Sequence, residues 1–352
     1  MSSRSDCKSV QEVYYKHEDG RDHASSCDQT NPLAPISEPE PTLDVGASSI
    51  THTRTLFLPP RRLALCGGGV RCIAHVGVFK ALQELNLLTC VKEVIGISAG
   101  ALFALMYCCG YTLEQIEQLA IQFDFSLLRN IDPESAFLFP TTLGLDSGEG
   151  LERFLTSILV RSGLKEGVTF QEMARQRPQT RLKCFATDIQ TSKVREFSLE
   201  ASPHISVKFA VRASMSLPIL YTPVKDPQTG HYLMDGGILH NLPLAFLHES
   251  HIQDTLAVLF TVRGRGDEVI ESEIDVLKFF QHIYDSITSM RNKVYLERFP
   301  KQVVCVPVKG TSVTDFEPTK EMRQQLIQIA FDTTLAFVKK AGTKPFRRYS
   351  VS

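Results

Sequence analysis

A serine between two glycines is the residue best suited to covalent chemistry in this chain. The segment Gly96-Ile97-Ser98-Ala99-Gly100 fits the G-x-S-x-G (GXSXG) pattern of nucleophilic serines. An apolar, β-branched run precedes it and helix-forming residues follow it. We therefore expect a sharp strand-to-helix turn that presents the Ser98 hydroxyl at a helix N-terminus. Because the pattern also arises by chance as a glycine-lined turn, companion residues must decide its function.

A glycine-rich segment, Gly67-Gly68-Gly69-Val70-Arg71, follows a short apolar stretch and precedes a helical pattern. Its backbone amides can converge on an anion or on the oxyanion of an acyl-transfer reaction. A dinucleotide-binding loop would need a further glycine where Cys72 stands, and Glu84 falls on the helical pattern rather than at a ribose. We favour the oxyanion hole, with Arg71 either supporting the loop by pairing with local carbonyls or facing a phosphate group of a substrate.

A serine nucleophile also needs a base, and Asp235 is the first candidate. It begins the turn Asp235-Gly236-Gly237, where an aspartate either bonds its own backbone or accepts a proton. An aspartate suffices if exclusion of water raises its basicity.

Histidine is the usual base, and a Ser-His-Asp hydrolase is the rival interpretation. His75 fits better as a neutral residue packed beneath the glycine loop. None of the later histidines stands in a triad-like setting after a strand: His204, His231, His240, His248, His251 and His282.

Two apolar stretches and the helix between them would position these loops. Arg62–Cys66 and Glu93–Ile97 have the composition of strands, and Ile73–Leu85 has helical periodicity. The unit has the usual length of a βαβ crossover, about 30 residues, which implies parallel strands whose carboxyl ends carry both loops. A second helix is expected from Ala99 to Cys109.

The later segments extend this into a mixed or mainly parallel sheet with helices on both faces. No repeat or linker divides residues 62–341, so we expect one domain. Thr112 and Gln115 form a capping box at a helix start. Further strands are predicted at Leu182–Ala186, Val194–Phe197, Leu256–Val262 and Val303–Val308, and amphipathic helices at Asp275–Arg298 and Pro318–Lys340.

Composition narrows the class of protein. The 352 residues carry a net charge of -1 with a pI near 6.8, which does not favour binding to nucleic acid. Residues 1–55 predict a disordered tail without a signal segment, and residues 342–352 a basic tail. The nine cysteines form no C-x-x-C pair, which predicts reduced thiols in an intracellular, cytoplasmic protein. The uncharged stretch Val94–Leu113 is long enough to span a membrane, but the Gly96-Ser98-Gly100 breakers favour a strand, turn and helix.

The glycine loop, the serine elbow and the Asp235 turn, in that order, make the chain resemble the patatin-like phospholipases. Phe185-Ala186-Thr187-Asp188, Ala213–Pro218 and Tyr221-Thr222-Pro223 resemble the same family. The likeness covers a catalytic domain of about residues 62–262, and residues 263–341 would form a helical and strand extension packed on it.

The resemblance implies a three-layer α/β/α fold with a mainly parallel central sheet and a Ser-Asp dyad without histidine, metal or cofactor. It places the nucleophile at Ser98, the base at Asp235 and the oxyanion hole at Gly67, Gly68 and Gly69. It also makes Asp188 a structural turn residue. Cys72 departs from the family, which usually has glycine there. A serine esterase acting on lipids is implied, as a phospholipase A, lysophospholipase or acylglycerol lipase that takes part in lipid degradation.

Two functions of the same fold stay open: an acyl-CoA-independent transacylase, and a catalytically weak lipid-binding protein, which only the Cys72 departure supports. Peripheral membrane contact is a further hypothesis. It would involve the basic tail and the apolar residues Phe279, Phe280, Ile283 and Ile287, unless that helix packs in the core and the tail is simply solvated.

Overall fold

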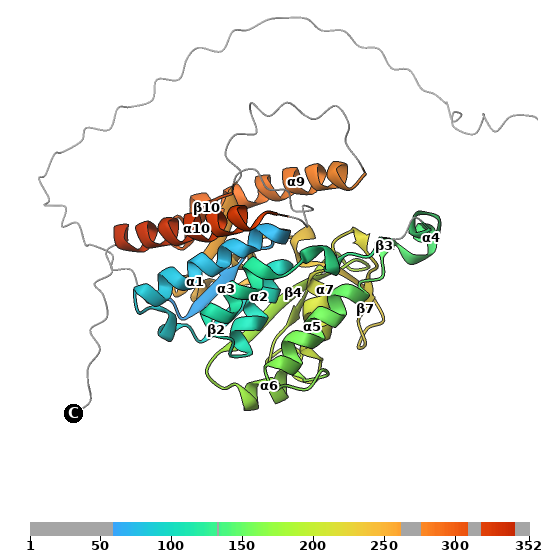
Figure 1. Ribbon diagram of the computed structural model, residues 1–352, viewed down its shortest axis with the longest axis horizontal. Coiled ribbons are helices and arrows are strands. Elements are labelled where there is room, and N and C mark those ends of the chain that lie inside the picture. Colours follow the sequence, from blue (N-terminus) through green and yellow to red (C-terminus); the bar gives the residue numbers. More distant parts are fainter. Residues whose placement is uncertain (1–58, 132–133, 262–275, 309–317, 342–352) are drawn as a thin grey trace, which may run out of the picture. The chain divides into compact units, whose positions relative to one another are not determined.

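The computed structural model describes residues 59–131, 134–261, 276–308 and 318–341. The expected N-terminal and basic tails lie outside these residues. Within them, an eight-stranded sheet has the order β10-β9-β1-β2-β4-β8-β7, with β5 also paired to β4 (Figure 1). The strands are β1 Arg62–Leu65, β2 Glu93–Ile97, β4 Arg181–Asp188, β5 Lys193–Phe197, β7 Val224–Lys225, β8 Tyr232–Asp235, β9 Thr255–Thr261 and β10 Val303–Pro307.

The five strands from β10 to β4 are parallel, and β5, β7 and β8 are antiparallel additions. The predicted βαβ unit is confirmed, because β1 pairs in parallel with β2 and places Leu65 opposite Gly96. All four later strands are also found. β3 Gly144–Asp146 and β6 Ile219–Tyr221 form a separate parallel pair that the sequence did not reveal.

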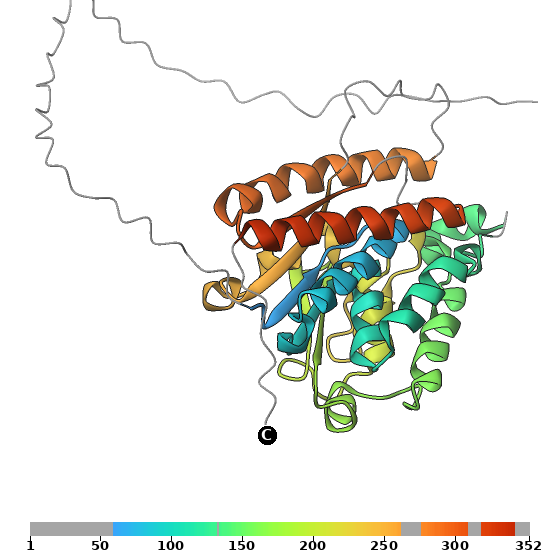
Figure 2. The ribbon, with the colours of Figure 1, turned by 60° about the vertical axis from the view of Figure 1, so that its left-hand side comes forward.

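Helices cover both faces of the sheet (Figures 1 and 2). Alternate strand residues separate the two layers: Leu63 and Leu65 join a core with α1, α2, α7 and α10, whereas Ala64 and Cys66 face η5 and α9. The helices are α1 His75–Glu84, α2 Ala99–Cys108, α3 Leu113–Gln122, α4 Ser135–Thr142, α5 Glu149–Arg161, α6 Phe170–Gln176, α7 Val207–Ser214, α8 Glu249–Ile252, α9 Val276–Arg298 and α10 Lys320–Lys340. Short 3-10 turns are η1 Gly69–Ala74, η2 Leu88–Cys90, η3 Phe125–Leu128, η4 Gly236–Ile238 and η5 Pro243–Phe246.

Most predicted helices are present with small shifts of their ends. The helix expected from Ile73 begins at His75, because the preceding residues wind as the 3-10 turn η1. The Thr112 capping box is confirmed in both of its hydrogen bonds. Residues 94–113 divide into β2, the elbow and α2, and no helix in the described part of the chain has the length and apolar content to cross a membrane.

Candidate active site

Ser98 occupies a strained elbow between β2 and α2. Its backbone has φ 54° and ψ −134°, a conformation that side-chain-bearing residues rarely adopt. The flanking glycines make the turn possible: a Cβ on Gly96 would lie 2.4 Å from the Ala101 Cα, and one on Gly100 would lie 2.5 Å from the Cys66 carbonyl oxygen. The Ser98 amide donates to the Ser214 hydroxyl at 3.0 Å, which fixes the turn from α7.

The glycine loop lies directly against this serine. A Cβ on Gly67 would come within 2.8 Å of the Ser98 Cβ. The Asn241 side chain clamps Gly67 on both sides, since its Oδ1 accepts from the Gly67 amide at 3.0 Å and its Nδ2 donates to the Gly67 carbonyl at 3.1 Å. Because the Gly67 amide is engaged in this way, Gly68 and Gly69 are the better candidates for oxyanion donors.

Asp235 ends β8 and is fully buried. Its Oδ1 accepts from the Gly237 amide at 2.8 Å, whereas its Oδ2 has no hydrogen-bond partner in the described structure. Burial raises the pKa of Asp235 from 3.8 to about 6, and interaction with the Ser98 hydroxyl and the Gly237 amide opposes the rise. The Ser98 hydroxyl is among the groups that hold the pKa of Asp235 down, which indicates that the two side chains lie near each other, and Oδ2 is left without a partner among the described residues.

The residues beneath the glycine loop are structural. His75 is buried, its Nε2 lies 2.9 Å from the Cys66 carbonyl oxygen, and burial lowers its pKa to about 4, so it packs as the predicted neutral imidazole. The Cys72 thiol points to the same carbonyl at 3.5 Å, and burial raises its pKa well above the ordinary value. Arg71 is also buried, with a guanidinium nitrogen 3.9 Å from Asp285 of α9, a position suited to loop support.

The rival bases lie elsewhere. Asp188 accepts from the Thr191 amide and pairs with His231 at 2.8 Å, which is the expected structural turn. His240 packs edge-on to Tyr295, and His248 caps α8 through Ser250. None of the hydrogen bonds that the described histidines make reaches Ser98 or Asp235, so the geometry favours the dyad over a triad.

An apolar cavity opens beside the Ser98 hydroxyl. Tyr221 closes part of its wall and donates to the Leu128 carbonyl at 2.9 Å. Apart from Ser98 and the Tyr221 hydroxyl, its side chains are hydrophobic. The lining residues come from η1, the elbow with α2, η3 and the segment around β6: Gly69, Val70, Ile73, Ser98, Ala99, Leu102, Phe103, Phe125, Leu128, Met215, Leu217, Leu220 and Tyr221.

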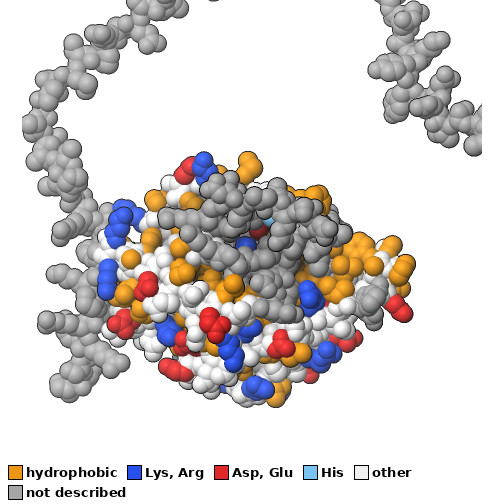
Figure 3. Space-filling model, turned by 45° about the horizontal axis from the view of Figure 1, so that its top comes forward, with side chains coloured by type: hydrophobic (Ala, Val, Ile, Leu, Met, Phe, Trp, Pro, Cys, Tyr) orange, Lys and Arg blue, Asp and Glu red, His pale blue; other side chains and the backbone are white. Residues whose placement is uncertain are grey.

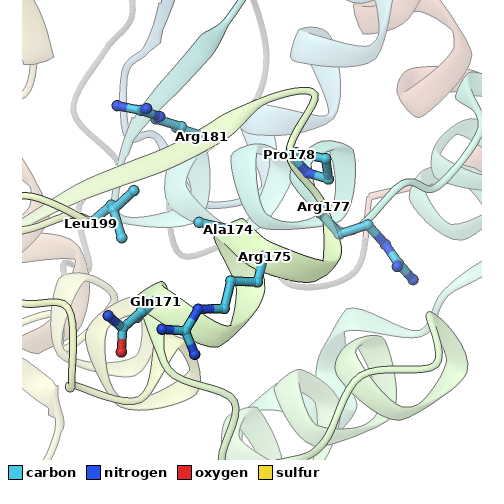
Figure 4. Close-up of a pocket in the computed structure, with 7 residues that line it drawn as sticks. All are labelled: Gln171, Ala174, Arg175, Arg177, Pro178, Arg181 and Leu199. Atoms are coloured by element: carbon cyan, nitrogen blue, oxygen red, sulfur yellow. The ribbon is translucent and has the colours of Figure 1, made fainter.

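A second hollow, lined by arginines, does not form a convergent anion site. The side chains of Arg175, Arg177 and Arg181 point in different directions (Figure 4). Arg177 donates to the carbonyls of Cys109 and Ser162, and Arg181 pairs with Glu200. The described residues also contain no group of three histidine, cysteine or acidic side chains arranged to hold a metal ion.

Sequence reasoning did not identify four residues that contact the candidate site. Ser214 stands in a segment that resembles the family and Asn241 follows the Asp235 turn, but the contacts of both depend on the fold. Tyr284 of α9 lies against the Asp235 turn: a Cβ on Gly237 would lie 1.7 Å from its hydroxyl, and burial together with the charge of Asp235 raises the pKa of Tyr284 well above its ordinary value. Arg291 fixes α9 to the same turn by donating to the Ile238 carbonyl at 2.9 Å.

Residues 63–248, more than half of the chain, match the family model of the patatin-like phospholipases, and the chain belongs to that family of lipid hydrolases. It is 24% identical to YqhO of Bacillus subtilis over 292 residues, which cover 78% of this chain and 96% of that protein. It is 28% identical to the neuropathy target esterase of Drosophila melanogaster over 196 residues, 56% of this chain but 12% of that much longer protein. The crystal structure of VipD from Legionella pneumophila aligns with a TM-score of 0.56 at 18% identity, covering 81% of this chain and 67% of that one, and so shares the fold.

Proposed function

We propose that this protein hydrolyses fatty acyl esters of lipids through an acyl-enzyme on Ser98, with Asp235 as the base. The observation that carries the proposal is a buried carboxylate of raised pKa beside an elbow serine, at the rim of an apolar cavity. With a pKa of about 6, Asp235 is about nine-tenths ionised at pH 7, yet basic enough to accept a proton. Membership of the family and the esterase named among the relatives support the same chemistry.

The reaction has two balanced halves. Asp235 takes the Ser98 hydroxyl proton as Oγ bonds to the acyl carbonyl carbon, and the loop amides of Gly68 and Gly69 stabilise the oxyanion. The carbon–oxygen bond to the leaving alcohol or lysolipid then breaks, and that oxygen takes the proton from Asp235. Water repeats the sequence on the acyl-enzyme and releases a fatty acid and free Ser98.

The cavity supports lipid esters as the substrate class. Its hydrophobic walls suit an acyl chain, which stays in an apolar environment when it leaves a lipid aggregate and contacts Phe103, Leu102 and Leu220. Because the substrate resides in lipid aggregates, we also propose that the enzyme works at a membrane surface as a peripheral protein. The α9 residues Phe279, Ile283 and Ile287 are exposed rather than packed in the core, and the side chain of Phe280 lies outside the described residues.

Labelling and product analysis test the proposal. A fluorophosphonate probe should label the wild-type protein and fail to label Ser98→Ala; a wild type that does not react would indicate a lipid-binding protein without turnover. Mass spectrometry after incubation with mixed phospholipids and neutral glycerides should show free fatty acids for the wild type and a loss of at least about 10³-fold for Ser98→Ala and Asp235→Asn. Acylated products that appear only with an added alcohol would identify a transacylase instead.

A further inference from the structure

Helix α4 is unusual because none of its residues is buried. Phe137 is 86% exposed and Leu138 55% exposed, and no charged residue occurs from Ser135 to Leu145. Figure 1 shows α4 standing out beyond β3, and in Figure 3 hydrophobic side chains gather at that end of the molecule. We name the exposed hydrophobic residues of this helix and its flanks the apolar tip: Leu127, Ile131, Phe137, Leu138 and Leu143.

The apolar tip is attached to the cavity that holds Ser98. On one side Leu127 adjoins Leu128, a cavity-lining residue of η3. On the other side the chain passes into β3, which pairs with β6 and so with Leu220 and Tyr221 of the cavity wall. The Tyr221 hydroxyl bonds to the Leu128 carbonyl and ties the two sides together. The tip therefore projects from a fixed base at the rim of the cavity.

The backbone at Leu143 gives an independent indication. This residue ends α4 with φ 58°, the left-handed conformation that glycine or asparagine usually supplies at a helix C-terminus. A leucine there is strained, and its side chain is exposed, so packing inside the protein does not explain it. A large apolar side chain kept in solvent at such a position points to an apolar partner outside the protein.

We propose that the apolar tip inserts into the surface of a lipid aggregate and places the cavity rim against the membrane. This inference rests on the proposed function, since a lipid surface is the partner that also contains the acyl chains the cavity would accept. Because residues 135–145 carry no charge, insertion of α4 needs no anionic lipid, so uncharged phosphatidylcholine vesicles should suffice. A second copy of the chain would also cover apolar residues, but it would block the cavity rim.

Tryptophan fluorescence tests insertion apart from catalysis. The chain has no tryptophan, so Phe137→Trp introduces a single reporter. Val160→Trp is the matched control: Val160 is 56% exposed near the far end of α5, which is 13 residues or about 20 Å long. In a Ser98→Ala background, phosphatidylcholine vesicles should shift the emission of Phe137→Trp to shorter wavelength and leave that of Val160→Trp unchanged. The proposal would be overturned if the protein sediments with the vesicles but the emission of Phe137→Trp does not shift. Binding would then occur through α9 or another surface.

Removal of the apolar side chains gives the second arm. Phe137→Ser/Leu138→Ser should keep the melting temperature, because neither side chain is buried, and should weaken vesicle sedimentation by about tenfold or more. In this variant, hydrolysis of a short, monomeric ester should stay at the wild-type rate while hydrolysis of vesicle lipid falls. A wild-type protein that hydrolyses neither substrate would instead refute the proposed function. Binding that requires phosphatidylserine and disappears in salt, or a wild-type dimer that this variant dissociates, would refute insertion.

Discussion

At the scale of single residues, the candidate site depends on the carboxylate of Asp235, which is buried away from water. Asp235 is buried with one oxygen unpartnered, and its neighbours Gly237 and Ser98 offset only part of the cost of removing the charge from water. That cost is what makes the carboxylate basic. A carboxylate with a raised pKa should affect both the pH dependence of the activity and the free energy of unfolding.

The activity should follow the ionisation of Asp235. The base must be unprotonated, so kcat/KM for a soluble ester should fall as pH drops below an apparent pKa of about 6 and reach a plateau above pH 7. A rate profile measured from pH 4 to pH 8 checks this. If kcat/KM instead falls only near pH 4, the carboxylate of Asp235 is solvated, contrary to its burial here.

Asp235→Asn should stabilise the fold while it removes activity. Because the folded pKa of about 6 exceeds 3.8, ionisation of Asp235 disfavours the folded state: its contribution is most favourable below pH 3.8 and is lost as pH rises through 6. At pH 7 the ionised carboxylate lowers the free energy of unfolding by about 3 kcal/mol relative to its neutral form. Asparagine removes this cost and keeps an oxygen that accepts from the Gly237 amide. Urea unfolding at pH 7 should therefore show a gain of up to that size, which shrinks at pH 4.

At the scale of elements, the site is an edge where the ends of strands meet. The glycine loop, the elbow and the proposed base Asp235 follow β1, β2 and β8, and α2 packs so closely on β1 that a Cβ on Gly100 would lie 2.5 Å from the Cys66 carbonyl oxygen. The close approach sets the distance between the nucleophile and the loop amides. Substitutions there should alter catalysis through geometry rather than through charge.

Gly100→Ala should separate these two elements. The added Cβ would lie 2.5 and 2.6 Å from the carbonyl oxygens of Cys66 and Leu65, so α2 must move, at a cost of about 1–3 kcal/mol and most of the activity. Gly167→Ala is the control, because nothing lies within 4 Å of its Cβ. Thermal unfolding and ester hydrolysis of both variants provide the comparison. If Gly100→Ala and Gly167→Ala have the same melting temperature and the same rate of ester hydrolysis, the elbow tolerates a shift of α2.

At the scale of the whole described unit, residues beyond 262 complete the core and the site. β10 extends the sheet on β9, α10 packs along α1, and α9 lays Tyr284 and Arg291 over the turn of the base. The part of the chain outside the family match is thus packed against the proposed site residues rather than forming a separate appendage.

Gly77→Ala tests the closest of these contacts. A Cβ at Gly77 would lie 2.0 Å from the Ile327 carbonyl oxygen and 2.7 Å from the Phe331 amide nitrogen, so α10 could not keep its place on α1. We expect a loss of about 1–3 kcal/mol or more, seen as a melting temperature several degrees lower. An unchanged melting temperature would mean that α10 is not closely docked.

The sequence by itself determined the local pieces of this protein. The elbow at Ser98, the glycine loop and the βαβ unit follow from short segments whose glycine spacing and apolar periodicity fix backbone conformation. The tertiary structure decided what depends on long-range packing. Antiparallel β8 brings Asp235 to the same edge, Asn241 accepts a hydrogen bond from the Gly67 amide, and Tyr284 of α9 lies against Gly237. Such contacts join segments far apart in the chain, and no local pattern encodes them, because they arise only when the elements pack around a shared core.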